Sequence, residues 1–399
     1  MIGVTAAVGA LLIAGATPGV PIPSAAFGQH VANIATAVPE GVQLTSLRLW
    51  DTGTRWDQVE TAPDRYTWDT LDAAVDNARA AGATDILYVH GSTPQWAAAD
   101  PELPGLYGPG STSLPRKTED YIDYVREVAQ RYKGRITAYQ IWNEANTRSF
   151  YEGDWTALAK LTRRARDAIK LIDPSAQVVA ASSTVIPGRL FQTESFFVRY
   201  ARALHKAGDP MDAMAVHLYP VDTSKGPDAR ARSIRAAQKV LNKVGIDKPL
   251  WDTEVNYGDR RSGLPTVVPD STTAVTYVAR TYLDSATLGI SRTYWYGWDL
   301  GVLGIDMTDS AGITAAGQAF LTVREWLTDA RPAGCQTDAG LRRCHFTAPD
   351  GAPFTVVWAT GATVTLDASG YEVCRLDGSC TPGADELLVN EQPLVLRGR

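Results

Sequence analysis

The feature that most constrains the fold of this chain is a regular alternation over residues 27–330. Apolar runs of five or six residues, rich in β-branched and aromatic side chains, alternate with longer amphipathic stretches. In Leu71–Ala81, Thr118–Tyr132 and Trp155–Ile172, apolar residues recur every three or four positions, which predicts helices. The predicted strands are Phe27–Val31, Ser46–Trp50, Asp85–His90, Ala138–Trp142, Gln177–Ala181, Ala213–Leu218, Pro249–Thr253 and Thr293–Trp298.

Eight strands alternating with helices predict an α/β fold of the (β/α)8 TIM barrel type. Gly82 and Gly134 stand where helices of such units end. A doubly wound sheet would have a glycine-rich turn after its first strand, and Phe27-Gly-Gln-His30 does not provide one. Beyond Arg331 the pattern changes to short alternating runs separated by Gly, Pro and Asp. We therefore expect a barrel over residues 27–330 and a small antiparallel β domain over residues 331–399.

All four cysteines fall in the predicted β domain. Their spacings favour two local disulfides, most simply Cys335 with Cys344 and Cys374 with Cys380, although four cysteines allow three pairings. A zinc site is the competing interpretation, but neither pair has CxxC spacing and only His345 lies nearby. Disulfides are typical of proteins exported into an oxidising compartment.

The first 26 residues have the character of a secretory signal peptide. Val4–Ala16 is almost continuously apolar or small, and Pro23-Ser-Ala-Ala26 resembles a cleavage site, although no Lys or Arg precedes the apolar run. The run is too short to span a bilayer, which takes about 20 apolar residues. We therefore expect a secreted, extracellular protein with no membrane span.

The charge balance argues against a nucleic-acid partner. The formal net charge is -6 and the pI is about 5.5. A protein that binds a phosphate backbone needs a basic surface instead.

Polar and aromatic residues gather where the predicted strands end. In a TIM barrel the carboxyl ends of the strands carry the catalytic residues. A single polar residue there is often only a strand entering solvent, but two glutamates on strands four and seven, with basic and aromatic residues between them, indicate a site. The strand-end candidates are Arg48, Trp50, His90, Asn143, Glu144, His217, Tyr219, Glu254 and Trp298.

Two carboxyl groups facing each other across a pocket suit the cleavage of a glycosidic bond. One stays protonated to donate to the leaving oxygen, and the other stays ionised to meet the developing positive charge on the sugar. We expect Arg48 to keep Glu254 ionised, and the apolar residues before Glu144 to raise the pKa of Glu144. Glycoside cleavage of this kind needs no cofactor and no metal.

The motifs "IWNEAN" and "WDTEVN", on strands four and seven, resemble those of the clan A retaining glycoside hydrolases, most closely family 39. The stretches "RLWDTGTRWDQVETAPDRYTWDTLD" and "YVHGSTPQWAA" add to the resemblance, which covers nearly all of residues 27–330. The family's nucleophile is often followed by Trp-Asn, whereas here Val255-Asn256 follows Glu254. This departure bears on the substrate rather than on the catalytic role.

The resemblance implies a retaining double displacement on an oligo- or polysaccharide, with Glu144 as acid/base and Glu254 as nucleophile. Asn143 would bind the 2-hydroxyl of the sugar, while Arg48 would orient Glu254. By the same resemblance, His217 and Tyr219 also surround Glu254, and the residues that line the subsite of the cleaved sugar are Trp50, His90 and Trp298.

Two other functions compete with this hypothesis. One is a carbohydrate-binding TIM barrel that has lost activity, although the presence of both glutamates argues against it. The other is a metal-dependent barrel hydrolase, which needs clustered His and Asp ligands. The five histidines of this chain form no HxH or HxxxH pair.

Overall fold

The computed structural model describes residues 19–185, 195–220, 225–261 and 266–399. These residues form two compact units, each described here by itself: one holds residues 27–256 and 290–300, and the other holds residues up to 26 together with residues 257–289 and 301–399. Most of the predicted signal peptide, residues 1–18, lies outside the described residues.

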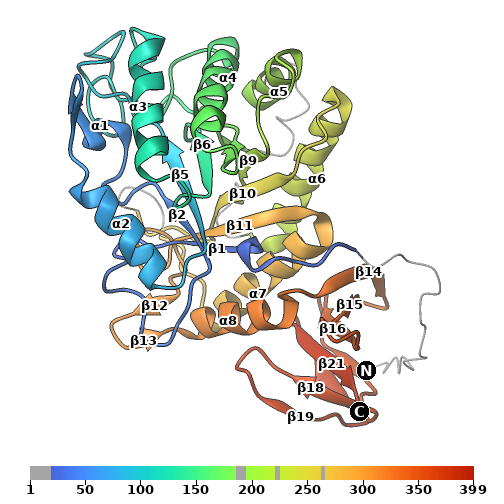
Figure 1. Ribbon diagram of the computed structural model, residues 1–399. Coiled ribbons are helices and arrows are strands. Elements are labelled where there is room, and N and C mark those ends of the chain that lie inside the picture. The colour runs from blue at the N-terminus through green and yellow to red at the C-terminus, as the bar shows by residue number, and fades with distance from the viewer. Residues whose placement is uncertain (1–18, 186–194, 221–224, 262–265) are drawn as a thin grey trace. The chain divides into compact units, whose positions relative to one another are not determined.

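A parallel sheet that curves into a ring forms the centre of the first unit (Figure 1). Its strand order is β7-β6-β5-β2-β1-β11-β10-β9-β8. A bridge between Val179 and Ala213, and a hydrogen bond from Ala180 N to Ala213 O of 2.9 Å, connect β7 to the start of β9 and close the ring. The strands are β1 (Phe27–His30), β2 (Ser46–Leu49), β5 (Asp85–His90), β6 (Ala138–Ile141), β7 (Gln177–Val179), β8 (Ser183–Thr184), β9 (Met214–His217), β10 (Leu250–Val255) and β11 (Ile290–Tyr296).

The predicted TIM-barrel fold is thereby confirmed. Each of the eight predicted strands is present, with β7 and β8 as two parts of the fifth, since both lie beside β9. One layer of the barrel interior consists of Leu87, Ala138, Val179, Ala213, Ala215, Trp251 and Tyr294. These side chains come from six strands, so they show which face of each strand points inward.

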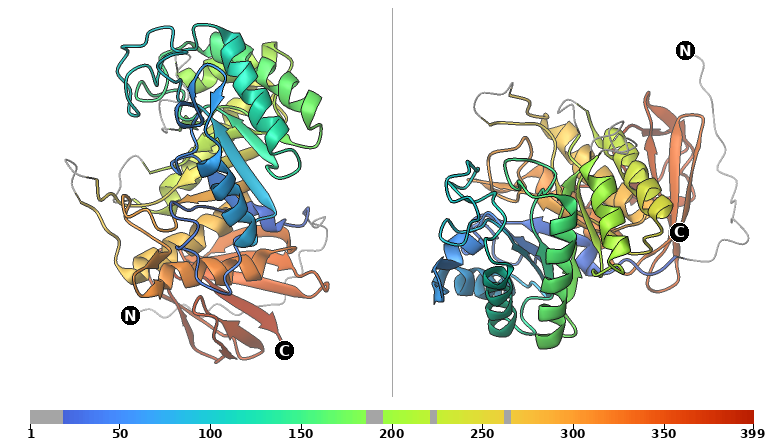
Figure 2. Two further views of the ribbon diagram at one scale, coloured as in Figure 1. Left: turned by 60° about the vertical axis from the view of Figure 1, so that its left-hand side comes forward. Right: turned by 90° about the horizontal axis from the view of Figure 1, so that it is seen from above.

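Helices cover the outside of the strands (Figures 1 and 2). The predicted helices agree closely with α2 (Asp69–Ala80), α3 (Thr118–Arg131) and α4 (Trp155–Ile172). The Asp154 side chain begins α4 by accepting hydrogen bonds from the N–H groups of the first turn. The remaining elements of this unit are α1 (Trp56–Val59), the hairpin of β3 (Glu60–Ala62) and β4 (Arg65–Tyr66), α5 (Phe196–Lys206) and α6 (Pro227–Val244).

The second unit combines helices with antiparallel strands. Its larger sheet has the order β14-β15-β16-β21-β18-β19, and β17 pairs with β20, which confirms the predicted antiparallel architecture. Disulfides join Cys335 to Cys344 and Cys374 to Cys380, as expected. The elements are α7 (Ser271–Leu288), β12 (Thr308–Asp309), β13 (Gly312–Ile313), α8 (Ala315–Leu327), β14 (Arg331–Asp338), β15 (Leu341–Thr347), β16 (Pro353–Ala359), β17 (Val364–Leu366), β18 (Tyr371–Cys374), β19 (Cys380–Pro382), β20 (Leu387–Val389) and β21 (Leu394–Gly398).

Residues 19–26, the end of the predicted signal peptide, are part of this second unit. Gly19 N donates to Pro332 O at 2.9 Å, and Ile22 N donates to Ala330 O at 3.0 Å. The Ile22 side chain is buried, and η1 (Ser24–Ala26) leads into β1. Among the described residues, no helix is long and apolar enough to cross a membrane.

Candidate active site

Arg48 connects two of the strand ends that the sequence singled out. Its side chain is fully buried, and its Nη1 donates to Glu254 Oε1 at 2.7 Å. Its Nη2 donates to Asn143 Oδ1 at 2.8 Å, so one guanidinium holds the residues that follow β6 against those of β10. Because Asn143 accepts with its oxygen, its amide nitrogen is left to donate to a ligand.

The second oxygen of Glu254 has its own partners. Tyr219 donates its hydroxyl to Glu254 Oε2 at 3.0 Å, and His217 Nδ1 lies 3.2 Å from the same oxygen. Glu254 is therefore fixed from both sides by groups that donate, which is the environment expected for an ionised carboxylate.

His217 also reaches the other carboxylate. Its Nδ1 lies 2.8 Å from Glu144 Oε1, and its Nε2 lies 3.1 Å from Thr253 Oγ1. Ionised carboxylates only accept hydrogen bonds, so the Nδ1 atom must carry the proton and direct it at the two glutamates. His217 faces inward because Ala213 and Ala215, two and four positions earlier on the same face, belong to the barrel interior.

Glu144 sits on an unusual stretch of backbone. Trp142 has φ 79° and Glu144 has φ 40°, which is the left-handed region that side chains other than glycine avoid. Two hydrogen bonds hold this conformation: Glu144 N donates to Ser182 Oγ at 2.9 Å, and the Trp142 indole donates to Phe150 O at 2.8 Å. The turn directs the carboxyl group of Glu144 toward His217.

Thr184 fixes the carboxyl group of Glu144 from the neighbouring strand. Its hydroxyl donates to Glu144 Oε1 at 2.8 Å. Asn146 holds Thr184 in place, because its side chain accepts from Thr184 N at 2.9 Å and donates to Thr184 O at 3.1 Å. Both donors to Glu144 bind Oε1, and among the described residues none binds Oε2. That oxygen is therefore available to a substrate.

The proton affinities of the two glutamates are the reverse of those expected from the sequence. Burial raises the pKa of Glu144, but hydrogen bonds from His217 and Thr184 outweigh it, so the net pKa lies below the ordinary value. Burial raises the pKa of Glu254 above its ordinary value; His217 and Arg48 oppose this, while the charges of Glu144 and Asp51 add to it. The sequence-based argument was wrong because Thr184 and His217 give Glu144 the stronger hydrogen bonds.

A cluster beside Glu254 was missed from the sequence. The carboxylate of Asp51 accepts from the hydroxyls of Tyr107 and Tyr296, both at 2.6 Å. The charge of Glu254 acts on both tyrosines, raising the pKa of each, with burial as the larger cause. His30, at the end of β1, stacks at 4.6 Å on Tyr296, and burial lowers the pKa of His30 to about 3. A histidine ending the first strand was the available signal.

Three predicted subsite residues lie away from the two carboxylates. His90 is fully buried among the tyrosines of β5, β6 and α3, and it stacks on Tyr139 at 5.3 Å. Trp298 is also fully buried, and its indole donates to Ala37 O at 2.8 Å. Trp50 is buried with its ring edge against Tyr107, at 5.6 Å. Of the described contacts, none joins these three rings to Glu144 or Glu254.

One set of atoms at the site has the chemistry of a metal site. Glu144, His217 and Glu254 offer ligand atoms that all lie within 4.8 Å of one another. However, Arg48 binds the Glu254 carboxylate at 2.7 Å, and its positive charge opposes a second cation there. The group Glu372, Cys374 and Cys380 offers no thiolate, because both cysteines form a disulfide.

Comparison with known families agrees with this geometry. The family model of cellulase, glycosyl hydrolase family 5, matches residues 46–301, which is more than half of the chain. The chain belongs to this cellulase family. It is therefore a clan A glycoside hydrolase, and the resemblance drawn from its motifs is confirmed at that level. This cellulase-family protein is a glycosidase.

Solved structures of clan A enzymes share the fold of this cellulase-family chain. A family 39 glycoside hydrolase from the gut symbiont Bacteroides cellulosilyticus WH2 is 17% identical, with a TM-score of 0.70 over 95% of this chain and 81% of that one. The catalytic domain of a family 30 xylanase C from Talaromyces cellulolyticus is 16% identical, with a TM-score of 0.62 over 96% and 98%.

Among curated proteins, the β-galactosidase BbgII of Bifidobacterium bifidum is 26% identical over 148 residues. The match covers 33% of this chain and 21% of that protein, so the chain spans about a fifth of the length of this relative.

Proposed function

We propose that this glycosidase is a secreted enzyme that hydrolyses O-glycosidic bonds of an oligo- or polysaccharide with retention of configuration, using Glu254 as nucleophile and Glu144 as acid/base. The observation that carries the proposal is the short separation of the two carboxylates, whose facing oxygens lie within 4.8 Å. Retaining enzymes place these groups about 5 to 5.5 Å apart, whereas inverting enzymes leave roughly 6.5 to 9.5 Å for a water molecule.

In the first step, an oxygen of Glu254 attacks the anomeric carbon and the bond to the leaving oxygen breaks. Glu144 donates its proton to that oxygen, so the alcohol leaves as a neutral molecule. In the second step, Glu144 takes a proton from water, the water oxygen attacks the anomeric carbon, and the bond to Glu254 breaks. Arg48 and Tyr219, which bind the two oxygens of Glu254, stabilise it as leaving carboxylate.

Glu144 and Asn143 have the free atoms that this mechanism needs. Oε2 of Glu144 is the oxygen that would carry the acid proton, since Oε1 already accepts from Thr184 and His217. The amide nitrogen of Asn143 would donate to the sugar 2-hydroxyl, because Arg48 fixes the amide oxygen. Both atoms then approach the cleaved bond from the same end of β6.

The lowered pKa of Glu144 and the raised pKa of Glu254 mean that substrate must help to set the reacting protonation state. The free site holds its proton more readily on Glu254 than on Glu144. We propose that a bound sugar, by placing the leaving oxygen beside Glu144, moves the proton to that residue. The pair is therefore expected to titrate as a unit, with a bell-shaped dependence of rate on pH.

The neighbouring proteins motivate the choice of substrates to test. They include a β-galactosidase, a family 30 xylanase and an endo-β1,6-glucanase. Secretion is supported by the two disulfides and by a structural neighbour that is a conserved exported protein from Bacteroides fragilis.

Hydrolysis of aryl glycosides and polysaccharides, with the anomer of the first product read by NMR, tests the proposal. We expect retention. Glu254→Gln should remove activity on every substrate, whereas Glu144→Gln should keep turnover of aryl glycosides whose leaving group needs no protonation. Inversion, or equal loss in both variants on such substrates, would contradict the assignment. An intact chain that binds sugars without cleaving any of the panel would favour the inactive carbohydrate-binding barrel.

A further inference from the structure

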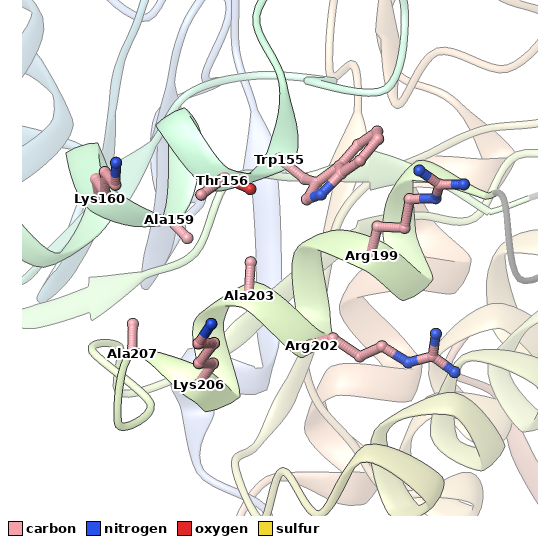
Figure 3. A pocket seen from close by; sticks show the side chains of 9 residues that line it. All are labelled: Trp155, Thr156, Ala159, Lys160, Arg199, Arg202, Ala203, Lys206 and Ala207. Carbon is pink, nitrogen blue, oxygen red and sulfur yellow. The ribbon is translucent and has the colours of Figure 1, made fainter.

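A groove of about 670 Å³ lies on the outside of the barrel, between α4 and α5 (Figure 3). The first turns of α4 form one wall, and the outer face of α5 forms the other. Helix α4 follows β6 and α5 follows β8, so both helices begin at the carboxyl end of the sheet, where Glu144 also lies. The residues that line the groove are Trp155, Thr156, Ala159, Lys160, Arg199, Arg202, Ala203, Lys206 and Ala207.

The groove concentrates positive charge in a protein whose net charge is -6. Four of its lining side chains are cationic, and among the described residues none of the lining is a carboxylate. Lys160, Arg202 and Lys206 are exposed, and within the described part of the chain they form no ion pair. Most other exposed arginines of α3 and α4, such as Arg126 and Arg164, lie beside an aspartate or a glutamate. The groove therefore differs from an ordinary solvated helix surface.

One aromatic ring stands at the end of the groove that lies nearest the catalytic side of the sheet. The Arg199 guanidinium lies over the Trp155 ring, 4.4 Å from its centre, and Figure 3 shows the two side chains next to each other. Phe196 meets the same indole edge-on at 6.3 Å, which fixes its orientation. A flat apolar face beside a guanidinium suits a sugar ring that carries a carboxylate, since the ring packs on the indole and the carboxylate pairs with arginine.

We propose that this groove is a second carbohydrate-binding site, separate from the catalytic centre, for an acidic polysaccharide whose sugars carry carboxylate groups. The cations come from two adjacent helices and follow the length of the groove, so successive uronate groups of one chain can each meet a positive charge. A neutral glycan would instead require amides and carboxylates to bind its hydroxyls, and the lining has none. A nucleic acid is disfavoured by the single aromatic side chain and by the acidic protein around the groove.

A polysaccharide held there is retained close to the catalytic side of the barrel. Its effect should therefore appear on long acidic substrates and be absent on small ones. The inference goes beyond the proposed reaction and does not depend on it, because binding in the groove needs neither glutamate.

Affinity electrophoresis of the full chain through gels that contain polygalacturonate tests the proposal. The variant Lys160→Ala/Arg202→Ala/Lys206→Ala should lose about tenfold in affinity, because three exposed charge contacts each contribute modestly. A matched control, Arg79→Ala/Lys133→Ala/Lys243→Ala, removes the same charge from exposed positions on other helices and nearby loops. The control should retain the affinity of the unmodified chain, and added salt should weaken binding of both.

Further arms separate the alternatives. Glu144→Gln should bind polygalacturonate as the unmodified chain does, so a failure of the catalytic proposal leaves this result untouched. If the triple variant does not fold, Lys206→Ala alone should still weaken binding and Trp155→Ala should weaken it at high salt as well. Absence of binding by the intact chain, equal loss in groove and control variants, or equal retardation by neutral dextran or by a DNA oligonucleotide would overturn the proposal.

Discussion

Thr184→Val should change the pH dependence of the enzyme at one limb only. The substitution keeps the shape of the side chain and removes the hydroxyl that donates to Glu144 Oε1 at 2.8 Å. The main-chain position of residue 184 should persist, because Asn146 binds its backbone N–H and C=O rather than its side chain. The variant therefore isolates a single hydrogen bond to the proposed acid/base.

The size of the effect follows from that bond. A hydrogen bond to a charged group contributes about 1.5 to 3 kcal/mol, and 1.36 kcal/mol corresponds to one pKa unit. The bond favours the ionised form of Glu144, so its loss raises the pKa of Glu144. His217 still donates to the same oxygen, so the lower end of the range applies and the rise should be about one unit. Because the acid must be protonated to act, the basic limb of kcat/KM moves to higher pH by that amount.

The assay is the pH profile of kcat/KM on an aryl glycoside with a poor leaving group, for which protonation matters most. Thr184→Ser, which keeps the donor, serves as the control and should reproduce the unmodified profile. An unchanged basic limb in Thr184→Val, or a shift of the acid limb instead, would refute the assignment of Glu144 as the proton donor.

Three further outcomes are expected. Treatment with EDTA should leave activity unchanged, and a loss restored by a divalent metal would contradict a purely carboxylate mechanism. Arg230→Met should destabilise the fold by about 3 to 5 kcal/mol, because it leaves Asp252 buried without its partner at 2.7 Å. That deficit, measured by urea unfolding, should shrink as pH falls below the pKa of Asp252, which burial raises to about 6 despite Arg230; a pH-independent deficit would refute this reading. Mass spectrometry of the exported protein should find its first residue at or before Gly19 and not after Ala26, since Gly19 and Ile22 hydrogen-bond to the chain beside β14.

The barrel was predictable because its strands are the apolar runs of the chain. Their carboxyl ends meet at one side of the ring, so Glu144 and Glu254 were expected near each other although 110 positions separate them. The partners of Glu144 were not predictable in the same way. Ser182 and Thr184 are small polar residues at the end of the fifth strand, and nothing in their local sequence distinguishes them from a surface turn.

His90 shows where a finer reading of the sequence was possible. Side chains alternate between the two faces of a strand, and Leu87 points into the barrel interior. His90 lies three positions later, so it points outward, against the tyrosines of α3. The parity of positions along β5 therefore separates a strand-end histidine of the interior, such as His217, from one of the outer core.

The left-handed backbone at Trp142 and Glu144 has a consequence for how the enzyme can change. A side chain in that conformation costs about 1 to 2 kcal/mol relative to glycine, so the fold alone favours Gly or Asn at both positions. A library of variants screened only for thermal stability should therefore accumulate such substitutions and become inactive. Screens that are meant to improve this enzyme need a catalytic readout from the first round, because stability and turnover favour different residues at the same two positions.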